Sequence, residues 1–262
     1  LYKAAAMAEG YESVPVDIDT FLNDPYYLGQ IYGNGQVYPY WMDALHKVFP
    51  NPLYSPYEEV CVTGCIGAGK TSFALMGAMY DLYHVTLLKD PHRKYKLLST
   101  TSIIFSLVTA TMDLASAVMA NQFLDAMGAS PYFCSKFNPK KGERLDEDMF
   151  PHHVGIGYGS RGGHNLGKAV IGSIIDEANF QDKVADQAVK NYDTITRRMK
   201  SRFMLKGGTL PCRRWLIWSR NDSSSFLESH IDAVRNDPHV IIFEPAIWDV
   251  QSYKGIYSGK TF

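Results

Sequence analysis

Residues 64–71 read Gly64-Cys65-Ile66-Gly67-Ala68-Gly69-Lys70-Thr71, a complete G-x-x-x-x-G-K-[ST] phosphate-binding loop. An apolar run at residues 60–62 precedes this loop, and a helix-like run at residues 72–82 follows it. Glycines in such a loop let backbone N–H groups turn inward around phosphate oxygens, and the positive end of the following helix adds to the attraction. The order of strand, loop and helix therefore predicts a nucleotide phosphate site rather than a chance glycine-rich turn.

The residues that close the loop have distinct expected roles. Lys70 would reach the β- and γ-phosphates, and Thr71 would place its hydroxyl on Mg²⁺. We expect the loop and the first residues of its helix to hold the nucleotide: Gly64, Cys65, Ile66, Gly67, Ala68, Gly69, Lys70, Thr71 and Ser72.

A second motif lies downstream, where residues 169–177 read Ala-Val-Ile-Gly-Ser-Ile-Ile-Asp-Glu. A buried strand that ends in two carboxylates is typical of a Walker B motif, in which Asp176 would hold Mg²⁺ through water and Glu177 would polarise the attacking water. A strand that simply ends in solvated acids would look the same. The complete phosphate-binding loop upstream favours the catalytic interpretation, and the adjacent Asp-Glu pair indicates an NTPase with a catalytic glutamate rather than a kinase or a small GTPase.

The remaining pattern alternates strands with helices, which predicts an α/β fold with a mostly parallel central sheet and helices on both faces. Roughly a hundred residues separate the two motifs and hold at least one further strand. This favours a P-loop NTPase of the additional-strand, catalytic-glutamate type, in which another strand lies between the Walker A and Walker B strands. We expect strands at residues 102–108, 154–158, 214–218 and 240–243, and helices at residues 41–49, 112–127, 181–203 and 226–234.

Three segments divide the chain. Residues 1–57 are loop-rich and aromatic and are expected to cover the nucleotide site, residues 58–247 form the ATPase core, and residues 248–262 read as a linker. The aromatic side chains of the first segment could stack on an adenine or could simply cover the sheet.

Two shorter motifs are less specific. Residues 89–96 are rich in basic side chains, which could contact phosphates or could belong to a solvated turn. Residues 157–162 read Gly-Tyr-Gly-Ser-Arg-Gly and match G-x-G-x-x-G. A dinucleotide site needs a helix directly after that motif, whereas residues 164–168 read as a loop before the Walker B strand, so we expect no Rossmann site.

Composition restricts the class of protein. With 262 residues, 46% of them apolar, the chain can form one large α/β domain or two small ones. Its net charge of −1 gives no overall basic field, so contacts with nucleic acid would come from a local patch or from a ring of subunits. The longest uncharged apolar stretch, residues 97–112, is shorter than the roughly twenty residues of a membrane span, and we expect no membrane partner and no signal peptide.

The order of these parts resembles the ATPase domain of the large terminase subunit of tailed bacteriophages, the motor that packages DNA. The resemblance covers about residues 21–248, and its individually specific motifs are the P-loop and the Asp-Glu pair. Supporting segments are residues 37–45 ahead of the loop, residues 106–115 after its helix, the Arg161-Gly162 pair, and residues 216–219, a strand that ends in a small hydroxyl residue.

The resemblance implies roles for two further residues. Ser219 could sense the γ-phosphate and couple hydrolysis to movement. Arg161 is the candidate arginine finger, inserted into the site of a neighbouring subunit, because a guanidinium can bridge oxygens of the transferring phosphoryl group. Arg161 could instead fix its own loop through a salt bridge. Its rivals for the finger, or for a solvated face, are Arg197, Arg198 and Arg202.

The function that the resemblance implies is an Mg²⁺-dependent ATPase that drives double-stranded DNA into a procapsid, within the host cytoplasm. Its implied partners are double-stranded DNA, identical subunits in a ring, the portal of the procapsid and the small terminase subunit. Two alternatives stay open: another additional-strand ATPase, such as a helicase or recombinase-like motor, and a nucleotide-gated assembly module.

The chain also departs from the family pattern. Trp41 stands where family members often carry a glutamine, and Ser219-Arg220-Asn221 replaces the usual Ser/Thr-Thr-Pro coupling motif. No cluster of metal-binding carboxylates follows residue 248, although large terminases carry a C-terminal nuclease. We therefore expect a motor domain without its nuclease.

Overall fold

A six-stranded sheet forms the centre of the molecule in the computed structural model, which describes residues 2–109, 119–136, 150–159, 167–176, 185–219 and 226–251. Its strands pair in the order β3-β2-β4-β5-β1-β6, and every pairing between these described strands is parallel. The predicted parallel sheet is therefore confirmed. The strands are β1 (Glu59–Val62), β2 (Ile103–Val108), β3 (Val154–Gly159), β4 (Ala169–Asp176), β5 (Arg214–Ile217) and β6 (Val240–Phe243).

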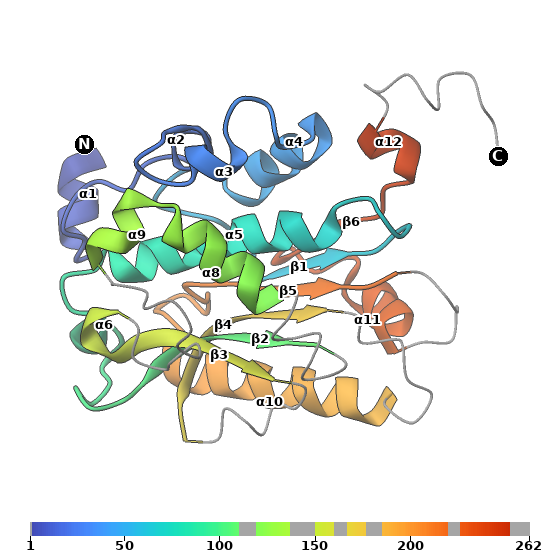
Figure 1. Ribbon diagram of the computed structural model, residues 1–262. Coiled ribbons are helices and arrows are strands. Elements are labelled where there is room, and N and C mark those ends of the chain that lie inside the picture. The colour runs from blue at the N-terminus through green and yellow to red at the C-terminus, as the bar shows by residue number, and fades with distance from the viewer. Residues whose placement is uncertain are drawn as a thin grey trace.

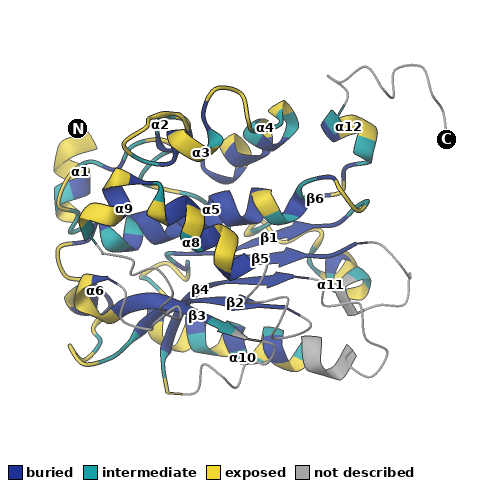
Figure 2. Cartoon of the chain, in the orientation of Figure 1, coloured by how far each residue is buried: buried dark blue, intermediate teal, exposed yellow. Residues whose placement is uncertain are grey.

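Helices cover both faces of this sheet, as Figure 1 shows. Strands β1, β2, β4 and β5 are buried along their whole length, which explains why their sequences are nearly continuous apolar runs (Figure 2). One face carries α5 (Lys70–Thr86), α8 (Asn121–Gly128) and α9 (Pro131–Lys136), and the other carries α10 (Ala185–Phe203) and α11 (Phe226–Val234).

The helix that follows the P-loop, α5, is buried on nearly every side. It packs against β4 and β5 on its inner side, while α2 (Ile18–Asn23) and α4 (Pro39–Val48) pack on its outer side. Gly77 allows the close approach to the sheet, because a Cβ at this position would overlap the indole ring of Trp215. On this face the core therefore comprises three layers: the sheet, α5, and the outer helices α2 and α4. Helix α5 is the middle layer.

The order of the strands confirms the additional-strand arrangement and identifies the strand concerned. Strand β5 lies between β1, the Walker A strand, and β4, the Walker B strand. It comes from later in the sequence than both, whereas β2 and β3, which the long segment between the motifs contributes, pair on the other side of β4. Val62, Ile217 and Asp176 stand in register at the carboxyl ends of these three strands.

The first 57 residues differ from the loop-rich segment that we expected. Among the described residues they hold four helices, α1 (Tyr2–Ala8), α2, α3 (Gly29–Tyr32) and α4. Start signals at single residues explain the difference: Asp17 accepts a hydrogen bond from the backbone N–H of Thr20 at 2.8 Å, and Pro39 occupies the first turn of α4. The helix expected at residues 41–49 is confirmed as α4, whereas α1, α2 and α3 were not predicted, because each is too short to show a long apolar period.

Other predicted elements agree to within a few residues. The basic segment holds a short helix, α6 (Pro91–Tyr95), rather than a simple turn, and another helix, α12 (Ile247–Gln251), occupies the start of the expected linker. The helix expected at residues 112–127 is represented by α8, and residues 110–118 lie outside the described part of the chain. Within the described ranges, no helix is both long and apolar enough to span a membrane.

Candidate functional site

The P-loop leaves the carboxyl end of β1 and leads directly into α5. Its glycines adopt backbone conformations that other residues rarely take, with φ of 132° at Gly64, 82° at Gly67 and 81° at Gly69. A side chain at position 64 would also be too close to its surroundings, because a Cβ there would lie 2.5 Å from the backbone oxygen of Pro245. The loop can therefore turn tightly and present its backbone to a ligand, as expected of a phosphate site.

Lys70, the first residue of α5, is buried at the centre of the loop and is only 7% exposed. Its Nζ donates hydrogen bonds to the backbone oxygen of Cys65 at 2.6 Å and to that of Gly64 at 3.2 Å. The same atom lies 3.3 Å from Oγ of Ser219, just beyond the end of β5. The lysine therefore connects the P-loop with the segment that follows the neighbouring strand and carries the candidate coupling residue.

Thr71 and Asp176 join the two halves of the predicted site. Oγ1 of Thr71 donates a hydrogen bond to Oδ2 of Asp176 at 2.8 Å, although 105 residues separate them in the sequence. Asp176 is the last residue of β4 and is only 7% exposed. A hydroxyl and a carboxylate side by side are hard oxygen ligands, the type that Mg²⁺ prefers, so these residues fit the ion that the sequence implies.

The structure thus brings together the loop, Asp176 and Ser219, and two predicted residues lie outside the described part of the chain: Glu177 and Arg161. The rival arginines lie on α10. Arg197 and Arg202 are exposed, and Arg198 donates to the backbone oxygen of Lys168 at 3.4 Å. Lys168 precedes β4, a strand of eight residues that spans roughly 26 Å. Arg198 is therefore anchored at the amino ends of the strands, whereas the P-loop lies at their carboxyl ends.

Trp41 contacts the P-loop directly, a role that the sequence did not reveal. Its Nε1 donates a hydrogen bond to the backbone oxygen of Ala68 at 2.7 Å, and its buried ring stacks on Phe73 with centroids 4.5 Å apart. Gln251 of α12 donates to the backbone oxygen of Gly67 at 3.3 Å. Residues 67 and 68 of the loop are therefore held by side chains from the N-terminal and C-terminal parts of the chain. No local sequence pattern predicts such contacts.

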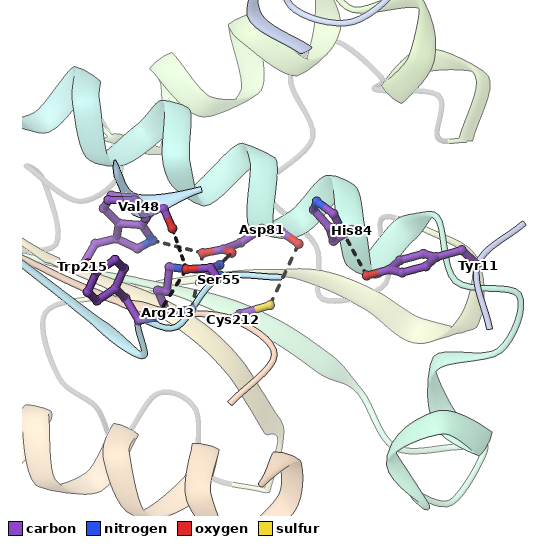
Figure 3. A network of polar contacts seen from close by, with 9 residues as sticks. Tyr11, Val48, Ser55, Asp81, His84, Cys212, Arg213 and Trp215 are labelled. Atoms are coloured by element: carbon purple, nitrogen blue, oxygen red, sulfur yellow. Dashed lines mark hydrogen bonds and ion pairs between the residues drawn. The ribbon is translucent and has the colours of Figure 1, made fainter. Parts of the chain in front are cut away.

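A buried ion pair fixes α5 against β5 behind the site, as Figure 3 shows. Asp81 of α5 pairs with Arg213, the residue before β5, and its Oδ2 accepts a hydrogen bond from Nε1 of Trp215 at 3.2 Å. Burial raises the pKa of Asp81, and Arg213 and Trp215 oppose that rise. Because Lys70 begins α5 and Ser219 follows β5, this pair helps to set the distance between them.

A second buried cluster lies on the other face of the sheet, at the start of β1. Glu59 accepts hydrogen bonds from Nε of Arg214 and from the hydroxyl of Tyr192, both at 2.9 Å, and contacts Nε2 of His230 at 2.5 Å. Burial alone would raise the pKa of Glu59, but His230 and Arg214 outweigh it and lower the pKa to about 2. The cluster ties β1 and β5 to α10 and α11, and so supports the strands that lead to the site.

Comparisons with known proteins agree with this architecture. No protein-family model and no curated protein matches the chain. Among solved structures, the large terminase of bacteriophage HK97 matches with a TM-score of 0.55 and 16% identity over 87% of this chain and 43% of that chain. The large terminase of a thermophilic bacteriophage, solved in complex with ADP, matches with a TM-score of 0.53 and 12% identity, over 82% of this chain and 47% of that chain.

A further structure of the same thermophilic phage terminase, in complex with ATP-γ-S, matches with a TM-score of 0.50 and 12% identity, over 82% of this chain and 46% of that chain. This chain therefore spans less than half the length of each of these large terminases. The likeness confirms the predicted fold, a P-loop α/β domain built as in phage large terminases.

Proposed function

We propose that this chain is the ATP-hydrolysing motor domain of a viral large terminase and drives double-stranded DNA into a procapsid. The observation that carries the proposal is the meeting of Lys70, Thr71, Asp176 and Ser219 at the carboxyl ends of adjacent strands. The large terminases that share the fold include one solved with ADP and with ATP-γ-S, which supports a nucleotide as the ligand of this site.

The residues of the loop suit the binding of a triphosphate. Lys70 is held by carbonyl oxygens of the loop, and its flexible stem would let Nζ turn toward the β- and γ-phosphates. Backbone N–H groups of the loop and the start of α5 would hold the remaining phosphate oxygens. Thr71 and Asp176 would hold Mg²⁺, which neutralises negative charge on the phosphates during transfer.

Hydrolysis would use the residue after Asp176. Glu177 would accept a proton from water as the water oxygen attacks the γ-phosphorus, and the bond from that phosphorus to the bridging oxygen would break to give ADP and inorganic phosphate. Arg161 of a neighbouring subunit would stabilise the charge on the transferring group. Ser219, in contact with Lys70, would transmit the loss of the γ-phosphate to β5.

The partners of the motor follow from the same proposal. They are double-stranded DNA, identical subunits arranged in a ring, the portal of the procapsid and the small terminase subunit, all in the host cytoplasm. A net charge of −1 is compatible with DNA contacts that are few in each subunit and shared around a ring.

Steady-state ATP hydrolysis at increasing protein concentration, with and without double-stranded DNA, tests the proposal. We expect turnover to rise faster than linearly with concentration, to increase with DNA, and to fall by about 10²–10⁴ in Glu177→Gln. Glu12→Gln, on the surface, is the matched control and should keep the parent rate. Unchanged turnover in Glu177→Gln would contradict the catalytic assignment, and strand separation by the chain would favour the helicase-type alternative. Tight ATP binding without hydrolysis at any concentration would favour the assembly module.

Mixing two inactive variants tests whether the finger acts between subunits. Glu177→Gln retains Arg161, and Arg161→Ala retains Glu177, so a mixed ring contains sites with an intact glutamate next to an intact arginine. Recovery of activity on mixing would show that the finger comes from a neighbour. Arg161→Ala activity equal to the parent would eliminate Arg161 as the finger.

A further inference from the structure

A hollow of about 670 Å³ lies at the amino end of the sheet, away from the P-loop. Helix α6 lines one side of it, and the short 3₁₀ turn Pro151–His153, which leads into β3, lines another. Figure 1 shows α6 beside the start of β3. The proposed ATPase mechanism uses none of the side chains that line this hollow.

Three of its residues bring metal-ligating atoms together. Asp90, His92 and His152 each offer one ligand atom, and these atoms all lie within 4.8 Å of one another. Two imidazoles and a carboxylate are a common ligand set for Zn²⁺ and related divalent transition metals. Ligand atoms around a tetrahedral Zn²⁺ lie roughly 3.4 Å apart, given Zn–N bonds of about 2.1 Å. Small rotations of the two exposed side chains, Asp90 and His152, would close the remaining gap.

A hydrogen bond fixes the tautomer of His92. His92 is buried at 5% exposure, and its Nε2 lies 2.8 Å from the backbone oxygen of Thr101. A carbonyl oxygen can only accept a hydrogen bond, so Nε2 must carry the proton, and the lone pair of the neutral ring is on Nδ1. Metal-binding histidines usually donate their other ring N–H to a carbonyl or carboxylate in this way.

Asp90 can cap α6 and bind a metal ion at the same time. Its Oδ1 accepts a hydrogen bond from the backbone N–H of Arg93 at 2.9 Å and so caps α6. The contacts described for this carboxylate leave Oδ2 for a cation. Arg93 also borders the hollow, but its side chain is exposed to solvent, which screens its charge.

His152 adds an independent observation, because its backbone has φ 64° and ψ 34°. His153 also has a positive φ, of 51°. Two successive non-glycine residues with a left-handed backbone are unusual. Such backbone conformations persist where a binding site or tight packing fixes them. Here the turn places an imidazole opposite the buried ring of His92, with centroids 6.5 Å apart.

We propose that Asp90, His92 and His152 bind a divalent transition metal of the Zn²⁺ type. The ion would link α6 to the turn that enters β3, and so would fix the edge strand of the sheet at the end opposite the nucleotide. A second group, Glu59, Cys61 and His230, also clusters closely, but Arg214 and Tyr192 already satisfy its carboxylate. The hollow beside α6 is therefore the better metal site, and this proposal does not depend on the proposed ATPase function.

Calorimetric titration of the metal-free chain with Zn²⁺ tests the site. We expect one ion per chain, and a loss of affinity of at least about ten-fold in Asp90→Asn and in His152→Asn. Both substitutions preserve the local structure, because asparagine caps helices well and tolerates the left-handed region. His46→Asn, which alters an exposed histidine beside Asp19, is the matched control and should bind Zn²⁺ as the parent does.

Absorption spectra with Co²⁺ distinguish this site from the cysteine-containing cluster. Bands in the visible region without thiolate charge transfer in the near ultraviolet, lost in His152→Asn, would support the proposal. Thiolate charge transfer would assign the ion to Cys61 or another cysteine and would overturn it. No binding by the parent, or equal binding by the parent, Asp90→Asn and His152→Asn, would also overturn it. Unchanged unfolding temperatures without metal would show that the two variants remain folded.

Discussion

Nζ of Lys70 lies 3.3 Å from Oγ of Ser219, so the first residue of α5 contacts the second residue after β5. This contact joins the P-loop to the strand between the two Walker strands. Because Lys70 is expected to contact the γ-phosphate, this contact could transmit the presence or loss of that phosphate to β5.

Ser219→Ala should therefore reduce turnover more than nucleotide affinity. We expect kcat to fall by about ten-fold, because one hydrogen bond that orients the lysine contributes roughly 1–1.5 kcal/mol, while KM for ATP should change little. Steady-state kinetics at saturating and limiting ATP measure both parameters. Ser13→Ala, an exposed serine, is the control. An unchanged kcat would remove Ser219 from the coupling route.

Trp41→Phe should destabilise the P-loop around Ala68. The substitution keeps a ring on Phe73 but removes the donor to the backbone oxygen of Ala68, a buried acceptor. We expect the free energy of unfolding to fall by about 1 kcal/mol and KM for ATP to rise several-fold. Urea unfolding and ATP titration measure the two effects. Tyr54→Phe, which alters an exposed ring, should change neither value.

The parts of the site that the sequence predicted are those with local signals. The P-loop is contiguous, and its glycines with positive φ, followed by α5, form a unit of strand, loop and helix. Asp176 was recognised because an apolar strand leads into it, and the hydrogen bond from Thr71 agrees with the pairing of the two motifs. Such features depend on backbone conformation and burial over a few residues, which sequence patterns record directly.

The remaining contacts depend on distant segments. The hydrogen bond from Trp41 to Ala68 spans 27 residues, and that from Gln251 to Gly67 spans 184, so no periodicity indicates either one. The strand between β1 and β4 was expected to come from the segment that separates the two motifs, but β5, from later in the sequence, occupies that position. Strand order follows from long-range packing rather than from local propensity.

Arg213→Met should destabilise the chain strongly. The substitution leaves the carboxylate of Asp81 buried without its cation, and breaking a buried pair in this way costs about 3–5 kcal/mol. The double variant Asp81→Leu with Arg213→Met should recover part of that loss, because no uncompensated charge then remains. Urea unfolding of the single and double variants measures the coupling.

Arg235→Met is the matched control for this cycle, because Arg235 forms its ion pair with Glu244 on the surface. Its unfolding midpoint should stay close to that of the parent, since exposed pairs contribute little. If the two effects at Asp81 and Arg213 simply add, the ion pair does not act as a unit, and its role in fixing α5 against β5 would have to be abandoned.

Glu59 should make stability depend on pH in the acid range. His230 and Arg214 lower its pKa from 4.5 to about 2, so the folded chain holds the carboxylate charged where the unfolded chain binds a proton. The resulting stabilisation is fully present above about pH 4.5 and is lost as the pH falls toward 2. A difference of about 2.5 pKa units corresponds to about 3 kcal/mol at neutral pH.

Urea unfolding of the parent and of Glu59→Gln at pH 7 and at pH 3 isolates this contribution, because the other carboxylates titrate in both proteins. The variant should be less stable at pH 7, since Arg214 loses its buried partner. The difference between the two should shrink by about 2 kcal/mol at pH 3, where the unfolded parent has bound the proton that its folded state still excludes. A difference that stays constant between the two pH values would mean that the pKa of Glu59 is not lowered and that its hydrogen bonds act without its charge.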